Sequence, residues 1–256
     1  MIETMRTAQR MRRMVVMLLP FCLGFSWMTL VIGPAYPRYE YAKPDFPPDW
    51  AAMEPNSGLV PFTPTERLAL ALPTVAYLES WQPADEAIRS LAEQRQPHTG
   101  APLYNERELR HLMDVKHLTD RVRWLALLTA VPVSSGLLFL LKRPHTRRLG
   151  YLALGQGGLL TVMLLSGLAA LILFGWPIFF YQFHGLLFAS GSWSFAPTDS
   201  LMRLYPERFF FDVGVIMSVC AWLWGFMAAV IGYRLAWRAK MPDTAIRGLH
   251  VQEVVG

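Results

Sequence analysis

Four long apolar blocks restrict this chain to a membrane protein built from helices. They cover Met14–Ile32, Val122–Leu141, Leu149–Phe174 and Phe210–Tyr233, and a helix needs about 20 apolar residues to cross a bilayer. Pro20 and Pro132 lie inside the first two blocks, but transmembrane helices tolerate proline because neighbouring helices can satisfy the freed carbonyl. With 53% hydrophobic and 17% charged residues, a soluble domain is a poorer explanation. We therefore predict an all-α integral membrane protein with four transmembrane helices.

The charge distribution predicts the orientation. Residues 1–13, 142–148 and 234–256 hold 12 of the 24 Lys and Arg but only three of the 19 Asp and Glu. By the positive-inside rule, both termini and the short loop between the second and third helices face the cytoplasm. The outer segment 33–121 and the outer loop 175–209 then face outward. The basic balance is thus explained by topology and gives little support to nucleic-acid binding.

The chain is expected to form a single membrane domain over residues 1–256. The first apolar block could instead be a cleaved signal peptide, but "VIGPAYPRY" offers no clean small-x-small cleavage site, so we expect a retained anchor. Twelve of the 19 prolines lie between Pro34 and Pro102, which favours an extended layer over the membrane rather than a compact domain. Two short helices are expected in this segment, one opened by the capping-box pattern Thr63–Glu66 and one at "ADEAIRSLAEQR".

A second capping-box pattern lies just before the second span. Asn105 followed by Glu108 predicts that a helix begins there, at the outer membrane surface. On this helix Arg107, His111 and Asp114 are four and three residues apart and share one face. The pattern presents a histidine with a carboxylate that could orient its ring.

Three of the six histidines are the stronger site candidates. His98 lies in a Pro-Gly loop, and His145 and His250 lie among cytoplasmic basic residues, where an interfacial or solvated role is expected. The outward segments hold the other three, His111, His117 and His184. An ionisable residue at membrane depth is expensive and suggests function.

His184 opens an unusual aromatic stretch, Tyr181–Val213. An interfacial belt of rings accounts for Trp176, Phe179 and Phe180. It does not account for the glycines, serines and charged residues that follow. A short helix Thr198–Leu204 is expected within an amphipathic re-entrant or interfacial lid.

These two stretches resemble a family of bacterial four-helix membrane proteins, the lipoprotein intramolecular transacylases. The resemblance rests on "RELRHLMDVK", residues 107–116, and "FHGLLFASGSWSFAPTDSLMRLYPERFF", residues 183–210. It implies an outward-facing active site in the bacterial plasma membrane that acts on diacylglyceryl-modified lipoproteins. The family's two essential histidines correspond to His111 and His184. The same motifs hold the residues expected to bind substrate or support the site: Arg107, Asp114, Lys116, Trp193, Asp199 and Tyr205.

The implied reaction moves the sn-2 acyl chain to the α-amino group of the lipoprotein's N-terminal cysteine, giving the lyso form. A histidine base suits an amine with a pKa near 8. Membrane lipid is the other partner, and neither a cofactor nor a metal is needed. The oxyanion donor could be Arg107, the second histidine or backbone amides near Gly191.

Two other classes of protein remain open. A metal-dependent membrane hydrolase could take ligands from His111, Asp114, His117 and His184, although that spacing is a loose ligand pattern. A non-catalytic transport or partner subunit would need polar residues inside the spans, and these are scarce apart from Gln156.

Overall fold

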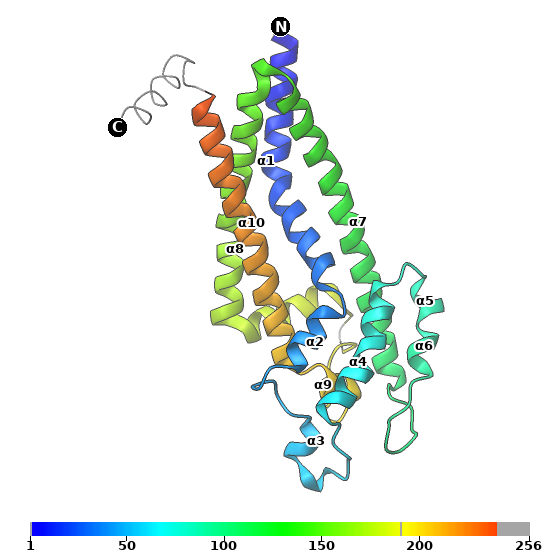
Figure 1. The fold of residues 1–256 in the computed structure, drawn as a ribbon. Coiled ribbons are helices and arrows are strands. Elements are labelled where there is room, and N and C mark those ends of the chain that lie inside the picture. Colours follow the sequence, from blue (N-terminus) through cyan, green and yellow to red (C-terminus); the bar gives the residue numbers. More distant parts are fainter. Residues whose placement is uncertain (1, 190, 240–256) are drawn as a thin grey trace, which may run out of the picture. The chain divides into compact units, whose positions relative to one another are not determined.

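The computed structural model describes residues 2–189 and 191–239. Within these residues four helices are long and apolar enough to cross a membrane, α1 (Ile2–Val31), α7 (Glu106–Lys142), α8 (Pro144–Leu187) and α10 (Glu207–Arg238) (Figure 1). The other elements are short: α2 (Ala35–Tyr41), α3 (Trp50–Met53), a 3-10 helix (Pro55–Ser57), α4 (Pro64–Glu79), α5 (Ala84–Ala87), α6 (Arg89–Ala92) and α9 (Ser200–Leu204). The prediction of an all-helical protein with four apolar spans is confirmed, while the side of the membrane that each end faces stays a prediction.

Two of the long helices extend well beyond the apolar blocks. α7 begins at Glu106 and continues without a break into the second span. α8 continues to Leu187, past a kink at Gly175, where the backbone leaves helical geometry at φ −130° and ψ 31°. The expectation that the outer loop starts at residue 175 was therefore wrong, because the chain stays helical for twelve residues after Gly175 and carries His184 on that extension.

Capping explains where two of the helices begin. The side chain of Thr63 accepts from the amide of Glu66, and Glu66 bonds back to the Thr63 amide, which confirms the capping box of α4. At α7 the side-chain oxygen of Asn105 accepts from the amides of Arg107 (2.9 Å) and Glu108 (3.0 Å), and the Asn105 amide donates to Glu108 Oε2 (2.8 Å). This second capping box confirms the predicted helix start just before His111.

The chain divides into two compact units, and each long helix contributes to both. The described part of the first unit comprises residues 2–25, 125–167 and 219–239. In it α8 and α10 approach closely: a methyl group added at Gly158 would come within 2.4 Å of the Ala229 amide nitrogen, and one at Gly232 within 2.3 Å of the Gly155 nitrogen. Glycine is thus required where the two backbones meet.

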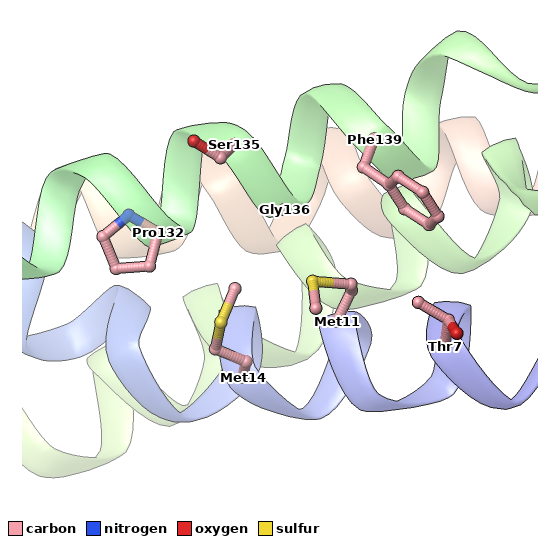
Figure 2. A pocket seen from close by; sticks show the side chains of 7 residues that line it. All are labelled: Thr7, Met11, Met14, Pro132, Ser135, Gly136 and Phe139. Atoms are coloured by element: carbon pink, nitrogen blue, oxygen red, sulfur yellow. The ribbon is translucent and has the colours of Figure 1, made fainter.

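An open pocket of about 370 Å³ also lies in the first unit, between α1 and α7. Figure 2 shows the side chains that line it: Thr7, Met11, Met14, Pro132, Ser135, Gly136 and Phe139. Its lining holds no titratable group, so this pocket lacks the chemistry of an acid–base site.

The described part of the second unit comprises residues 26–124, 168–189 and 191–218. Its hydrophobic core joins the proline-rich segment to α7, α9 and the start of α10; the buried members include Phe62, Ala71, Tyr77, Leu91, Leu103, Leu112, Leu204 and Phe209. The prediction of an extended layer was wrong, because segment 34–102 packs its short helices around this shared core. The second helix expected there is also split, into α5 and α6.

Candidate active site

His111 lies on the second turn of α7, in the second unit. Its side chain is buried, and its ring packs against Phe188 (4.9 Å between ring centroids) and Phe195 (5.2 Å). Within the described residues, Nδ1 of His111 is buried and has no hydrogen-bond partner. Because buried polar atoms nearly always have a hydrogen-bond partner, an unpaired ring nitrogen between aromatic rings indicates a place for an external group.

His184 lies on α8 beyond the kink at Gly175. Its ring packs against Phe180 (4.0 Å between centroids), Trp193 (5.1 Å) and Phe188 (5.6 Å). Nδ1 lies 2.7 Å from the carbonyl oxygen of Phe180. A carbonyl oxygen only accepts, so Nδ1 carries the hydrogen and donates, which leaves the lone pair of a neutral ring on Nε2.

Phe188 contacts both histidine rings, so the structure brings His111 and His184 to one aromatic cluster. We call Phe180, Phe188, Trp193 and Phe195, which surround the two rings, the aromatic cage. The kink at Gly175 redirects α8 before His184, and the loop after α8 returns Trp193 and Phe195 to the cage. Local sequence spacing could not predict this meeting, because His111 and His184 lie on different helices.

The end of this loop is bonded to the start of α7. Asp199 Oδ2 accepts from Arg107 Nη2 (2.9 Å) and from the amide of Ala196 (2.7 Å), and Asp199 Oδ1 accepts from Asn105 Nδ2 (3.2 Å). The Arg107 guanidinium also lies 5.2 Å from the centroid of the Phe195 ring. Asp199 occupies the N-cap position of α9, at the expected place, but its side chain makes no capping bond in the described structure. Its carboxylate instead accepts from the Ala196 amide within the loop and from two side chains at the start of α7.

Two other candidates, Lys116 and Tyr205, have contacts of a different kind. Lys116 is fully buried, and its Nζ donates to the Ser80 carbonyl (2.8 Å) and to Asp120 (2.7 Å). The hydroxyl of Tyr205 donates to the Ala71 carbonyl (3.0 Å), and burial is the largest cause raising the pKa of Tyr205 well above its usual value. The polar groups of Lys116 and Tyr205 are thus each hydrogen-bonded to other residues of the protein.

Asp114 is exposed, and no hydrogen bond joins it to His111 in the part of the chain that the structure describes. His117 is exposed as well. Across residues 2–189 and 191–239, no group of three His, Cys, Asp or Glu side chains is arranged to hold a metal ion. The ligand set considered for a metal-dependent hydrolase is therefore not assembled.

The remaining histidines lie elsewhere. His98 pairs with Glu66, with 3.2 Å between Nε2 and Oε1. His145 lies at the start of α8. His250 lies outside the described residues, as do Lys240 and the tail that follows it.

Sequence reasoning did not predict the long-range bonds that two buried carboxylates, Glu108 and Asp49, make to α9. Glu108 is 1% exposed, and its Oε1 accepts from the amide of Leu201 (2.7 Å), which links α7 to α9. Asp49 receives two hydrogen bonds from Arg203 of α9. The capping pattern pointed to Glu108 but not to its second bond, and no local pattern marks Asp49 as the partner of Arg203.

Comparisons with known proteins match this architecture. A family model described as lipoprotein intramolecular transacylase Lit matches residues 75–210. An uncharacterized protein of Aquifex aeolicus (strain VF5) is 25% identical over 219 residues, which are 85% of this chain and 91% of the relative.

Two solved structures of the membrane-integral lipoprotein intramolecular transacylase Lit from Bacillus cereus share the fold. The in meso structure has a TM-score of 0.60 and 19% identity, covering 90% of this chain and 96% of that one. A variant in which one histidine is replaced by alanine has a TM-score of 0.62 and 17% identity, covering 93% and 97%.

Proposed function

This chain belongs to the lipoprotein intramolecular transacylase family of bacterial membrane proteins, and from that premise we propose which atoms carry out the transfer. The sn-2 acyl chain of a diacylglyceryl-cysteine lipoprotein moves to the α-amino group of its N-terminal cysteine, with His111 and His184 as the catalytic pair. The observation that carries the proposal is the contact of both rings with Phe188, while Nδ1 of His184 is bonded to the Phe180 carbonyl.

His184 is the proposed base. Because Nδ1 of its neutral ring donates to the Phe180 carbonyl, Nε2 presents the lone pair that accepts a proton. The substrate α-ammonium first loses one proton to the solvent, which gives the nucleophilic amine and leaves the Nε2 lone pair of His184 free for the transfer step. The backbone bond also fixes the ring plane on α8, so Nε2 is held in one direction.

The acyl transfer itself conserves protons. The amine nitrogen attacks the ester carbonyl, a C–N bond forms, and the nitrogen gives one further proton to Nε2 of His184. The tetrahedral intermediate then breaks its C–O bond, and the sn-2 oxygen leaves as a hydroxyl after receiving a proton. We assign His111, which also contacts Phe188, to relay that proton from the His184 imidazolium: its neutral ring gives one proton to the sn-2 oxygen as its other nitrogen takes one, so both histidines end neutral. The products are the amide and the free sn-2 hydroxyl.

The aromatic cage has two proposed tasks. Amine and ester belong to the same molecule, so correct folding of the substrate can replace an encounter between two molecules, an effect that can be very large. The rings also exclude water, which would otherwise hydrolyse the ester instead of allowing transfer. Apolar surroundings further favour a neutral imidazole, the form that can accept a proton.

The supporting residues receive more limited roles. We assign Arg107 and Asp199 to positioning the loop that carries Trp193 and Phe195, because their side chains bond to each other at its end. Lys116 and Tyr205 stabilise the fold around the site. Asp114, exposed on α7, would act on the substrate rather than on the His111 ring. The site faces the outer side of the plasma membrane in this proposal.

The test is a mass spectrum of the N-terminal peptide of a reporter lipoprotein from cells that lack N-acyltransferase activity. Cells that supply the wild-type protein should yield the lyso-form peptide. His111→Ala and His184→Ala should leave the diacylglyceryl peptide unchanged, because each removes one proton-transfer group.

His117→Ala is the matched control, since His117 is exposed on the same helix as His111. It should retain lyso-form production. If the wild-type protein is present in the membrane and the peptide stays diacylated, the proposed reaction is refuted. If either histidine variant keeps wild-type activity, the assignment of the pair is refuted.

A further inference from the structure

Trp193 lies in the loop between α8 and α9 and forms one wall of the aromatic cage. Its ring lies 5.1 Å from the His184 ring at an interplanar angle of 36°, and it meets Tyr181 edge-on with 5.0 Å between centroids. Trp193 is therefore held by ring contacts on two sides. Its indole nitrogen is brought into the same cluster as both histidines.

The indole nitrogen of Trp193 is buried and has no hydrogen-bond partner in the described structure. An indole N–H can only donate, and leaving a buried donor unpaired costs about 1–3 kcal/mol. Two other tryptophans show the usual arrangement: the indole nitrogen of Trp176 donates to Glu207, and that of Trp222 donates to Ser166. The unpaired donor of Trp193 needs a different explanation.

The location of this donor supplies one. Buried side-chain nitrogens and oxygens without a partner are few among the described residues, and two of them, His111 Nδ1 and Trp193 Nε1, belong to side chains in or against the cage. Arg107, which the sequence offered as an oxyanion donor, is already paired with Asp199 and lies over Phe195. The cage thus contains an unused, rigidly held N–H group beside the proposed base.

We propose that the Trp193 indole N–H donates a hydrogen bond to the carbonyl oxygen of the substrate ester and stabilises the oxyanion that forms when the amine attacks. This assignment rests on the proposed transacylase function and names a further catalytic residue for it. As the C–N bond forms, the carbonyl π electrons move onto oxygen, and the N–H shares its proton without transferring it. When the C–O bond breaks, the electrons return and the carbonyl of the new amide is formed.

The assignment differs from a proton-transfer role in its pH behaviour, and it differs from a packing role because only the N–H, and not the shape of the ring, is required. The indole N–H does not titrate near neutral pH, so its loss lowers kcat equally across the pH profile. Loss of a proton-transferring histidine would instead change the shape of that profile. Removal of one donor from an oxyanion hole lowers kcat by a factor of about 10²–10³.

The experiment replaces only the N–H group. Trp193→3-benzothienylalanine keeps the shape of the ring but substitutes sulfur for N–H, and Trp193→5-fluorotryptophan keeps the N–H as the matched control. The purified full chain in proteoliposomes is given a synthetic diacylglyceryl-cysteine lipopeptide, and lyso-form product is followed by mass spectrometry. Thermal unfolding of each protein tests whether the ring still packs.

We expect the benzothienyl protein to lose about 10²–10³ in kcat, with a much smaller change in KM, an unchanged pH optimum and an unfolding temperature no lower than that of the wild type, because the unpaired donor is removed. The fluorotryptophan protein should stay within a few-fold of wild type. A benzothienyl protein within about threefold of wild type would overturn the assignment, as would an equal loss in both analogues. A wild-type protein that makes no lyso form would overturn the proposed function itself, and this inference with it.

Discussion

Replacement of Arg203 by alanine should destabilise the second unit strongly. Arg203 is 2% exposed, and its partner Asp49 is equally buried. Two parallel hydrogen bonds join them, Nε to Oδ1 at 3.0 Å and Nη2 to Oδ2 at 2.6 Å. Arg203 also donates to the Val60 carbonyl (2.7 Å), and its guanidinium lies 3.9 Å from the centroid of the Phe62 ring. Alanine removes all of these contacts and leaves the carboxylate buried.

Breaking a buried, hydrogen-bonded ion pair by removing one partner costs about 3–5 kcal/mol, because the remaining charge loses its compensation. Asp49 would keep its bond from the amide of Phe62 (2.8 Å), so we expect the lower half of that range. For a chain of this size each kcal/mol corresponds to a shift of about 2–4 °C in Tm, which gives a decrease on the order of 6 to 16 °C. Removing both partners in Arg203→Ala/Asp49→Ala should cost less than the sum of the single variants.

The assay is thermal unfolding in detergent, followed by intrinsic fluorescence. Arg110→Ala is the matched control, because Arg110 pairs with Glu106 at 3.7 Å with both side chains largely exposed. A pair of that kind contributes about 0.5 kcal/mol or less. An Arg203→Ala shift as small as that of Arg110→Ala would refute the reasoning, and so would additive effects of Arg203→Ala and Asp49→Ala.

Three other predictions concern pH, packing and capping. Burial acts to raise the pKa of Asp49, but the hydrogen bonds and charge of Arg203 and the amide of Phe62 outweigh it and hold the pKa below its usual value. The resulting stability is present above the unfolded pKa of about 4 and is lost as pH falls through the lower folded value. Asp49→Asn should therefore lose less stability than wild type on acidification below about pH 4, and an identical acid dependence in urea unfolding would contradict this. Gly158→Val should lower Tm by several degrees because its side chain would overlap the α10 backbone, whereas Gly167→Val, where the described atoms leave open space, should change it little. Thr63→Ala should cost about 1 kcal/mol through loss of the α4 cap, and full recovery of that loss by Thr63→Ser, which keeps the hydroxyl, is the expected control result.

Local chemistry predicted the parts of the fold that depend on neighbouring residues. The apolar blocks identified the four long helices, and the Thr63 and Asn105 capping boxes located two helix starts. Each of these signals needs only a few consecutive residues or one apolar run. The short helix before Pro206 was placed for the same reason, since a polar N-cap position and a proline bound it.

Long-range packing explains what the sequence did not predict. The many prolines suggested an extended outer segment. However, the aromatic side chains of this segment, such as Phe62 and Tyr77, share a buried core with residues of α7 and α9, which lie far along the chain. The continuation of α8 past Gly175 depends on side-chain contacts of the extension, such as the edge-on packing of Trp176 against Phe211. The apolar block ended at Phe174, yet the helix kinks at Gly175 and continues to Leu187.

The candidate site depends on both kinds of information. Three residues within two turns of α7 serve it: Arg107 bonds to Asp199, Glu108 bonds to the amide of Leu201, and His111 enters the cage. The first two bonds fix the end of the loop that carries Trp193 to α7, the helix that carries His111. The Trp193 ring packs against the second histidine, His184. The loop could not be rigid through its own sequence, which is rich in glycine and serine. Its end is instead held by polar bonds to α7, in which Asp199 accepts from Arg107 and Asn105.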